Sequence, residues 1–189
     1  MDNERLNILK FLVENQNKEF SIRQISIHRK INYKTAYISL QDLEKEEIVT
    51  LKKQGNTIIC LVNHKFNDLV FEVEYARLQE LLKNKNFFVI YNKLLKINSQ
   101  FILLLFGSHA KGKETKNSDI DLLLICDNSK PIESQIKLIP LNIHLTSIKY
   151  DGFKSMLNSK EFSVVSEAVK HNILLFGIED YYRLMNNAR

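Results

Sequence analysis

Apolar residues at the start of the chain recur with a helical period. Leucine occupies every third position from Leu6 to Leu12, which predicts an amphipathic helix over residues 3–15. Ser21 and Gln24 form a possible capping box that starts a second helix. Asn32 can cap a third helix, in which alanine and leucine at spacings of four and three form an inward stripe. Three short helices are therefore expected.

The pattern then changes from helical to extended. Residues 48–51 and 57–62 are rich in β-branched and apolar side chains, and a basic, glycine-containing segment joins them. Two such runs around a short turn predict a β-hairpin. With the three helices, this hairpin predicts an N-terminal domain over residues 1–65.

The rest of the chain alternates helical segments with apolar runs. Residues 66–85 contain no Gly or Pro and predict one long helix, assigned as a connecting helix at 66–87. Residues 88–189 predict an α/β domain with a small mixed sheet, so the whole chain is expected to be α+β. The expected elements of this domain are a helix at 88–97, strands at 101–106 and 119–125, a polar loop at 127–137, a strand at 138–148, helices at 150–158 and 162–171, a strand at 173–177 and a terminal helix.

Gly107 and Ser108 close the apolar run 101–106. A glycine at the end of a buried strand allows a sharp bend and a close backbone approach to a ligand. Ser108 would begin a short helix, whose free N–H groups and hydroxyl suit phosphate oxygens. This bend is therefore a candidate phosphate site.

Asp119 and Asp121 precede a second apolar run. Because side chains of a strand alternate between faces, the two acids should share a face at a spacing of about 6.5 Å. Hard oxygen ligands at this separation suit Mg²⁺ bound to a triphosphate. The alternative is that the two acids are only solvated side chains at the start of a strand. Two carboxylates on one face repel each other unless a cation is present.

The stretch from Phe106 to Leu122 combines the Gly-Ser bend with the Asp-x-Asp pair. This joint motif resembles that of the polymerase-beta-like nucleotidyltransferases, particularly their minimal members, over about residues 88–180. The resemblance implies transfer of a nucleotide from an NTP such as ATP to a hydroxyl, with Mg²⁺ as cofactor. In such relatives the acceptor can be a protein, including a toxin partner, or a small molecule such as an aminoglycoside.

The same resemblance implies roles for individual residues. The residues expected to bind nucleotide are Gly107, Ser108, Lys111 and Ser118. The expected metal ligands and catalytic residues are Asp119 and Asp121. Lys111 stands where relatives commonly have arginine, which keeps the charge but loses a bidentate donor.

Relatives usually carry a third carboxylate on the following strand. Here the polar face of that strand offers Asn142, His144 and Thr146, none of which is acidic. This departure motivates a second hypothesis, a transcription regulator whose transferase-like domain binds nucleotide with weak or no catalysis. A third hypothesis is an adaptor that joins a partner protein through the long helix.

The N-terminal segment resembles the winged helix-turn-helix family, best over residues 32–49. In that family the third helix enters the major groove and the wing contacts the DNA backbone. The residues implied to contact DNA are Tyr33, Lys34, Thr35 and Tyr37 on the helix, with Lys52 and Lys53 on the wing. One departure is Glu47, at a turn where many relatives have glycine. The alternative is a protein-docking role, because residues 21–53 carry a surplus of only three cations.

Composition bears on the partners and the cellular location expected for the protein. A net charge of +5 permits partners such as DNA or nucleotide phosphates without requiring either. No apolar run approaches the roughly 20 residues that span a bilayer, and the charged start is unlike a signal peptide, so we expect a cytoplasmic protein without membrane contact. Cys60 and Cys126 lack metal-site spacing and are expected to be buried thiols. A homodimer through the long helix is a further hypothesis.

Overall fold

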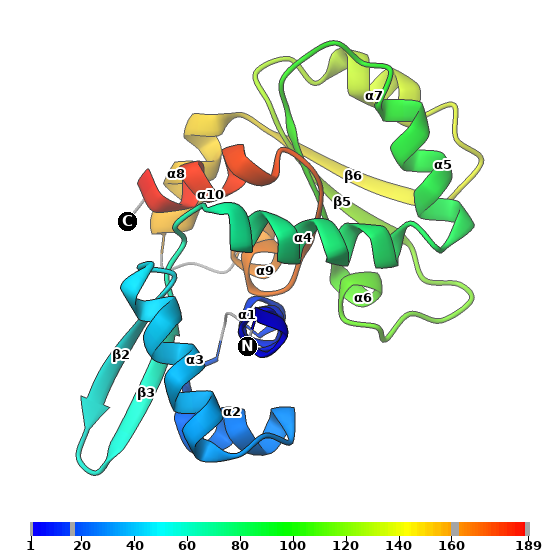
Figure 1. Ribbon diagram of the computed structural model, residues 1–189. Coiled ribbons are helices and arrows are strands. Elements are labelled where there is room, and N and C mark those ends of the chain that lie inside the picture. Colours follow the sequence, from blue (N-terminus) through cyan, green and yellow to red (C-terminus); the bar gives the residue numbers. More distant parts are fainter. Residues whose placement is uncertain (1, 16–17, 160–162, 188–189) are drawn as a thin grey trace. The chain divides into compact units, whose positions relative to one another are not determined.

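The computed structural model describes residues 2–15, 18–159 and 163–187 (Figure 1). The chain divides into two compact units, Met1–Val73 and Glu74–Arg189. Both contain helices and a small sheet, so the chain is of the mixed α+β class that the pattern predicted.

The first unit opens with the three predicted helices, α1 (Asp2–Glu14), α2 (Ile22–Arg29) and α3 (Tyr33–Lys45). The capping box of α2 is confirmed, because Gln24 N donates to Ser21 Oγ and Ser21 N donates to Gln24 Oε1. The cap of α3 is also confirmed, since Thr35 N donates to Asn32 Oδ1 at 2.8 Å. The fully buried core residues of these helices include Leu9, Ile25 and Leu40.

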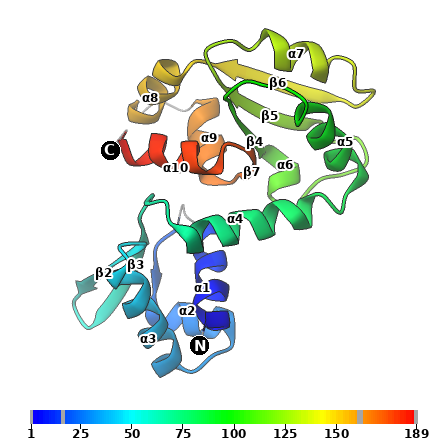
Figure 2. The ribbon, with the colours of Figure 1, turned by 45° about the horizontal axis from the view of Figure 1, so that its top comes forward.

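The hairpin is present as β2 (Val49–Gln54) and β3 (Thr57–Val62), drawn in cyan in Figure 2. A two-residue strand, β1 (Phe20–Ser21), completes an antiparallel sheet of order β1-β3-β2. No alternation could predict β1, because two residues carry no period. Its pairing of Phe20 with Cys60 holds the start of α2 against the hairpin.

The turn from α3 to β2 keeps a left-handed residue although glycine is absent. Glu47 has φ 60°, and Ile48 N donates to Leu43 O at 3.0 Å, which closes the end of the helix. Asn63 Nδ2 donates to the Glu47 carbonyl oxygen at 2.9 Å and thus supports the same turn. The turn therefore has a left-handed residue at Glu47, and the backbone is strained there because Glu47 carries a Cβ.

Replacing Glu47 with glycine should stabilise the protein by about 1 kcal/mol, because glycine adopts positive φ without a Cβ clash. The Glu47–Lys65 ion pair that would be lost is exposed and contributes little. Urea unfolding of Glu47→Gly measures the gain. Glu47→Ala removes the same carboxylate but keeps the Cβ, so it should show no gain; equal stabilities of the two variants would contradict the strain.

The two helices predicted at 66–85 and 88–97 are both present, but their predicted bounds are wrong. The structure has two helices, α4 (Asp68–Leu81) and α5 (Lys85–Leu94), and Asn84 caps the second by accepting from Asn86 N at 3.0 Å. The predicted first helix ran past Asn84 and the predicted second helix began only at 88, although asparagine favours caps over helical positions. The boundary between the two units falls within α4, after Val73.

The sheet of the second unit is mixed, as predicted. Its strands are β4 (Ile102–Phe106), β5 (Ile120–Ile125), β6 (Ile143–Ile148) and β7 (Ile173–Phe176), in the order β6-β5-β4-β7. β5 and β6 are parallel, whereas β4 pairs antiparallel with both β5 and β7. A short helix, α6 (Gly107–Ala110), follows β4 directly.

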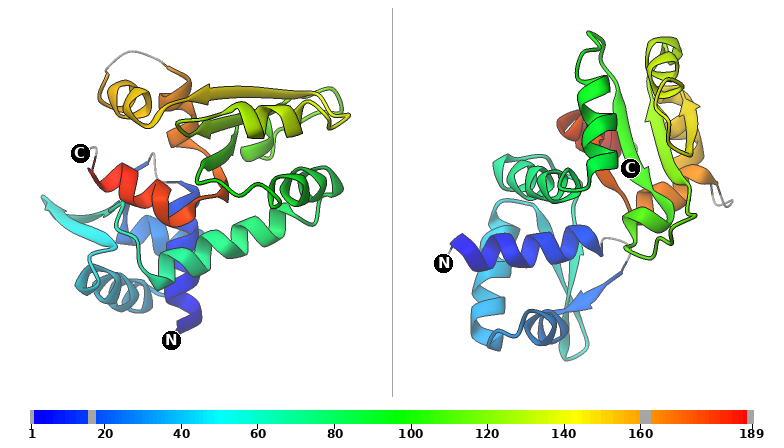
Figure 3. Two further views of the ribbon diagram at one scale, coloured as in Figure 1. Left: turned by 90° about the horizontal axis from the view of Figure 1, so that it is seen from above. Right: turned by 90° about the vertical axis from the view of Figure 1, so that its right-hand side faces the viewer.

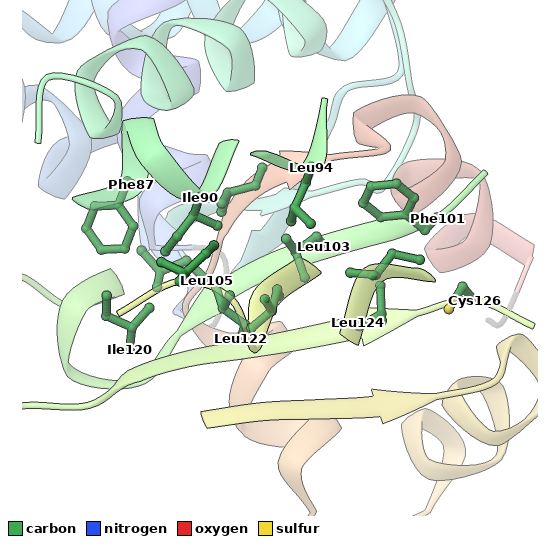
Figure 4. Close-up of a cluster of buried hydrophobic side chains, with 14 of the residues drawn as sticks. Phe87, Ile90, Leu94, Phe101, Leu103, Leu105, Ile120, Leu122, Leu124 and Cys126 are labelled. Carbon is green, nitrogen blue, oxygen red and sulfur yellow. The ribbon is translucent and has the colours of Figure 1, made fainter. Parts of the chain in front are cut away.

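One face of this sheet is covered by α5 and α7 (Lys130–Ile136). Figure 4 shows Ile90 and Leu94 of α5 above Leu103 and Leu105 of β4 and Leu122 and Leu124 of β5. Because strand side chains alternate, Asp121 lies between Ile120 and Leu122 on the opposite face. Helices α8 (Tyr150–Asn158), α9 (Val164–Lys170) and α10 (Ile178–Asn187) complete the unit, seen from two further sides in Figure 3.

Two predicted elements of this unit are corrected. The polar loop expected at 127–137 contains α7, whose Ile132 and Ile136 are one turn apart and buried. The strand expected at 138–148 begins only at Ile143, because a turn at 137–138 and a bend around Pro140 precede it. The predicted start of the helix at 162 lies outside the described residues.

A buried polar network joins α4 to the C-terminal part of this unit. Arg77 contacts Glu74 at 2.6 Å and donates to Asn172 O at 2.5 Å. The Tyr182 hydroxyl donates to Glu74 Oε1 at 2.7 Å. The Glu74 and Arg77 side chains are only 1% and 8% exposed, so each charge depends on these partners.

Both cysteines are free and buried, as predicted. Burial raises the pKa of the Cys60 thiol to about 12 and also raises the pKa of Cys126. Such thiols are poor nucleophiles at neutral pH. In the described residues, every helix is too short or too polar to cross a bilayer.

Candidate active site

Gly107 forms the bend that the sequence predicted at the end of β4. Its φ is 71°, and a Cβ at this position would collide with Asp121 Oδ2 and lie 3.0 Å from Asp121 Cγ. Phe106 pairs with Asp121 across the β4–β5 ladder, which brings the bend and this carboxylate to the same end of the sheet. A larger residue at this position would therefore strain the backbone and displace the Asp121 carboxylate.

Asp121 also faces the neighbouring strand β6. It is in register with His144, whose Nδ1 lies 3.4 Å from Asp121 Oδ1. The Asp121 side chain is 28% exposed and that of His144 is 68% exposed. The carboxylate therefore lies between the glycine bend and an imidazole, with one side open to solvent.

Asp119 precedes β5 and is exposed. Its Oδ1 accepts a hydrogen bond from Asn142 Nδ2, while Ile120 N donates to Asn142 O at 2.9 Å. Asn142 thus holds the entry of β5 by both its backbone and its side chain. It stands beside the acidic pair, directly before β6.

The exposed loop between α6 and β5 is held by short-range hydrogen bonds. Ser118 Oγ accepts from Thr115 N at 2.8 Å, and His109 Nε2 lies 3.3 Å from Ser118 O. The Lys111 ammonium pairs with Glu167 of α9 at 3.0 Å. Sequence reasoning missed Glu167, because nothing local links two residues 56 positions apart.

The side chains at this end of the sheet can bind a divalent cation together with phosphate. Asp119 and Asp121 supply hard carboxylate oxygens, and Mg²⁺ is commonly held by one or two carboxylates plus substrate phosphates and water. In the part of the chain that the structure describes, no group of three or more His, Cys, Asp and Glu side chains could hold a metal ion. The donor set therefore fits an ion shared with a substrate rather than a closed protein site.

Comparison with known families agrees with this geometry. Residues 92–181 match the family described as Polymerase beta, Nucleotidyltransferase. This match supports a polymerase-beta-like nucleotidyltransferase domain in the second unit, and the bend and the acidic pair both lie within it. No curated protein and no solved structure gave a significant match.

The residues predicted to contact DNA all belong to the first unit, outside the residues 92–181 that match the family. The Tyr33 and Tyr37 rings stack at 6.3 Å on α3, and Tyr33 is 50% exposed. Lys34 and Thr35 are on the first turn of the same helix. Lys52 and Lys53 are on β2, where Lys53 is exposed and pairs in register with Ile58.

Gly107→Ala should lower nucleotide transfer by about a hundredfold, because the new methyl group displaces the Asp121 carboxylate. The matched control is Gly112→Ala. Gly112 has a similar φ of 61° but nothing within 4 Å of a Cβ, so it imposes the same backbone strain without the collision. Transfer rates of both variants, measured with labelled NTP, separate the two effects. Equal losses would assign the effect to strain and contradict the collision.

Proposed function

We propose that the protein is a Mg²⁺-dependent nucleotidyltransferase that moves a nucleotide from an NTP, ATP foremost, to a hydroxyl acceptor. The observation that carries the proposal is the contact between the Gly107 bend and Asp121. A Mg-triphosphate requires a turn that binds phosphate and an acidic side chain that binds the cation, both at the same end of the sheet. The family match to residues 92–181 supports the same reaction class.

In this proposal each residue of the site has one task. Backbone N–H groups at the Gly107–Ser108 bend and the Ser108 hydroxyl hold phosphate oxygens, with Ser118 ordering the adjoining loop. Lys111 can exchange its Glu167 partner for phosphate, since this ion pair is partly exposed. Asp119 and Asp121 hold Mg²⁺, which when bound neutralises charge that develops on the phosphates.

The bond changes follow from the reaction class. The acceptor oxygen forms a bond to the α-phosphorus, the bond from that phosphorus to the bridging oxygen breaks, and pyrophosphate leaves with the electron pair. The proton of the acceptor hydroxyl passes to solvent water on the open side of the site. Asn142 orients Asp119 through its side-chain hydrogen bond, and His144 borders Asp121 on the open side.

The acceptor is best identified by transfer of label. The protein is incubated with α-labelled NTPs, Mg²⁺ and acceptors of two classes, cognate proteins such as a candidate toxin and small hydroxyl compounds such as aminoglycosides. Labelled acceptor and released pyrophosphate in equal amounts support the proposal. Tight Mg-NTP binding without transfer to any acceptor would instead favour the second candidate, a regulator that binds nucleotide without catalysis. This candidate is considered because Asn142 and His144 stand where a third carboxylate is expected.

We further propose that the first unit is a winged-helix domain that binds DNA through α3 and the β2–β3 hairpin. Three helices followed by a hairpin, with exposed Tyr33 and the cations Lys34, Lys52 and Lys53, support this role. DNA binding should weaken with salt, and Lys52→Ala with Lys53→Ala should lower the slope of log K against log salt by about 2. No DNA binding by the intact chain at low salt would leave a protein-docking role.

A further inference from the structure

In the part of the chain that the structure describes, β6 is an edge strand of the second sheet with one side unpaired. On its other side, Ile120 N donates to Asn142 O at 2.9 Å and Cys126 N donates to Ile148 O at 3.1 Å. In a parallel ladder, every second residue directs both backbone groups to the neighbouring strand. The backbone N–H and C=O groups of the even-numbered residues of β6 therefore point to β5. Those of Ile143, Leu145 and Ser147 point to the open edge.

This edge lacks the features by which proteins usually block strand pairing. The strand reads Ile-His-Leu-Thr-Ser-Ile, without Pro, Lys or Gly, and its register with β5 runs without a bulge from Ile143 to Ile148. Edge strands are commonly protected by such residues or by bulges, because unpaired N–H and C=O groups are a template for another strand. β6 is therefore competent for pairing along its whole length.

A groove of about 540 Å³ follows the same edge. It is lined on one side by Glu133, Ile136 and Lys137 of the α7 segment, and on the other by Ile143, Leu145 and Ser147. Leu138, in the turn between α7 and β6, is 67% exposed. A strand added to the edge would bring apolar surface against these side chains as well as main-chain hydrogen bonds.

The charges beside the groove are self-complementary. Ser147 Oγ donates to Glu133 Oε1 at 2.8 Å, which sets Glu133 level with Ser147. Lys137 is one helical turn further along, about 6 Å, which matches the rise of two strand residues. Because the short connection at 137–142 returns the chain, α7 runs antiparallel to β6 and Lys137 is level with Leu145. A two-fold axis at Thr146 would therefore set Lys137 of one copy beside Glu133 of the other.

We propose that β6 pairs antiparallel with β6 of a second copy of this chain, so that two four-stranded sheets become one continuous sheet. Leu145 of one copy then pairs with Ser147 of the other, and the same patch serves both copies, as a closed two-fold dimer requires. Each dimer gains two Glu133–Lys137 contacts between copies. This inference is independent of the enzymatic activity.

Sedimentation equilibrium of the full chain tests the dimer and its charges. The wild type should show a monomer–dimer equilibrium. Lys137→Glu and Glu133→Lys should each weaken association about tenfold by placing like charges together in both contacts, and the combined swap should restore it. Lys130→Glu makes the same charge reversal at the start of α7, outside the groove lining, and should leave association unchanged.

A backbone variant tests the strand pairing itself. Ser147→Pro removes an N–H that points to the open edge, which an edge strand tolerates, and should abolish dimers while circular dichroism stays native. Ser147→Ala loses the same hydroxyl but keeps the N–H and should still associate. If Ser147→Pro does not fold, the charge-swap series decides. A monomeric wild type, a dimer indifferent to the swaps, or a monomer that binds an unrelated extended peptide at 143–147 would each overturn the proposal.

Discussion

Replacing both Asp119 and Asp121 with asparagine should reduce nucleotide transfer by at least about 10³-fold. In the proposed reaction Asp119 and Asp121 hold a divalent cation, so removing their two negative charges should cost several kcal/mol of stabilisation of the developing charge. Asparagine preserves the size of both side chains, so the Asp121 contact with Gly107 stays sterically possible. Transfer of α-labelled NTP to its acceptor, with and without Mg²⁺, measures the effect, and omission of the metal should match the double variant.

The control for this prediction is a second pair of acids on the same unit. Asp127 and Asp151 are exposed and have no contact with the bend in the described residues, so their double replacement by asparagine changes net charge equally. That variant should transfer nucleotide at the wild-type rate. If Asp119→Asn with Asp121→Asn retained full transfer, the proposed site would be the wrong one.

Arg77→Met should destabilise the second unit by about 3–5 kcal/mol. The substitution leaves the 1% exposed Glu74 carboxylate without a neutralising charge, and an unpaired buried charge is among the most costly defects in a protein. It also leaves Asn172 O without its Arg77 donor. Urea unfolding followed by circular dichroism gives the change in the free energy of unfolding.

An exposed ion pair of the same spacing provides the comparison. Glu80, near the end of α4, and Lys83, just beyond it, are also three residues apart, but both side chains are more than half exposed. Lys83→Met should therefore cost under about 1 kcal/mol. Adding Glu74→Gln to Arg77→Met should recover part of the loss, because it removes the buried charge; no recovery would show that the lost volume of arginine, not the charge, is the cause.

The helix starts were predictable because their determinants are local. Ser21 with Gln24 and Asn32 with Thr35 are each three residues apart, and the capping hydrogen bonds form within that span. Asn84 carried the same kind of signal, but the prediction placed it at the end of the first helix instead of at the start of the second. α7 was missed because a seven-residue helix with two buried isoleucines is too short to show a period.

The chemistry of the site depends on pairings that no local pattern encodes. Asp119 with Asn142, Asp121 with His144 and Lys111 with Glu167 join residues on different strands or helices. The alternating polar residues of β6 indicated which side chains share a face, but their partners follow from the parallel register of β5 and β6. The catalytic, nucleotide-binding and DNA-binding roles of individual residues stay predictions.

By itself the sequence determined most of the helices and strands, the buried apolar runs, and the bend at Gly107, because propensity, caps and glycine act over a few residues. Only the tertiary structure decided which carboxylate touches that bend, that Glu74 and Arg77 are buried together, and that β6 is an open edge. These features arise when segments distant in the chain pack side by side. Such packing is selected by the summed burial and hydrogen bonding of the whole unit, which no short stretch of residues contains.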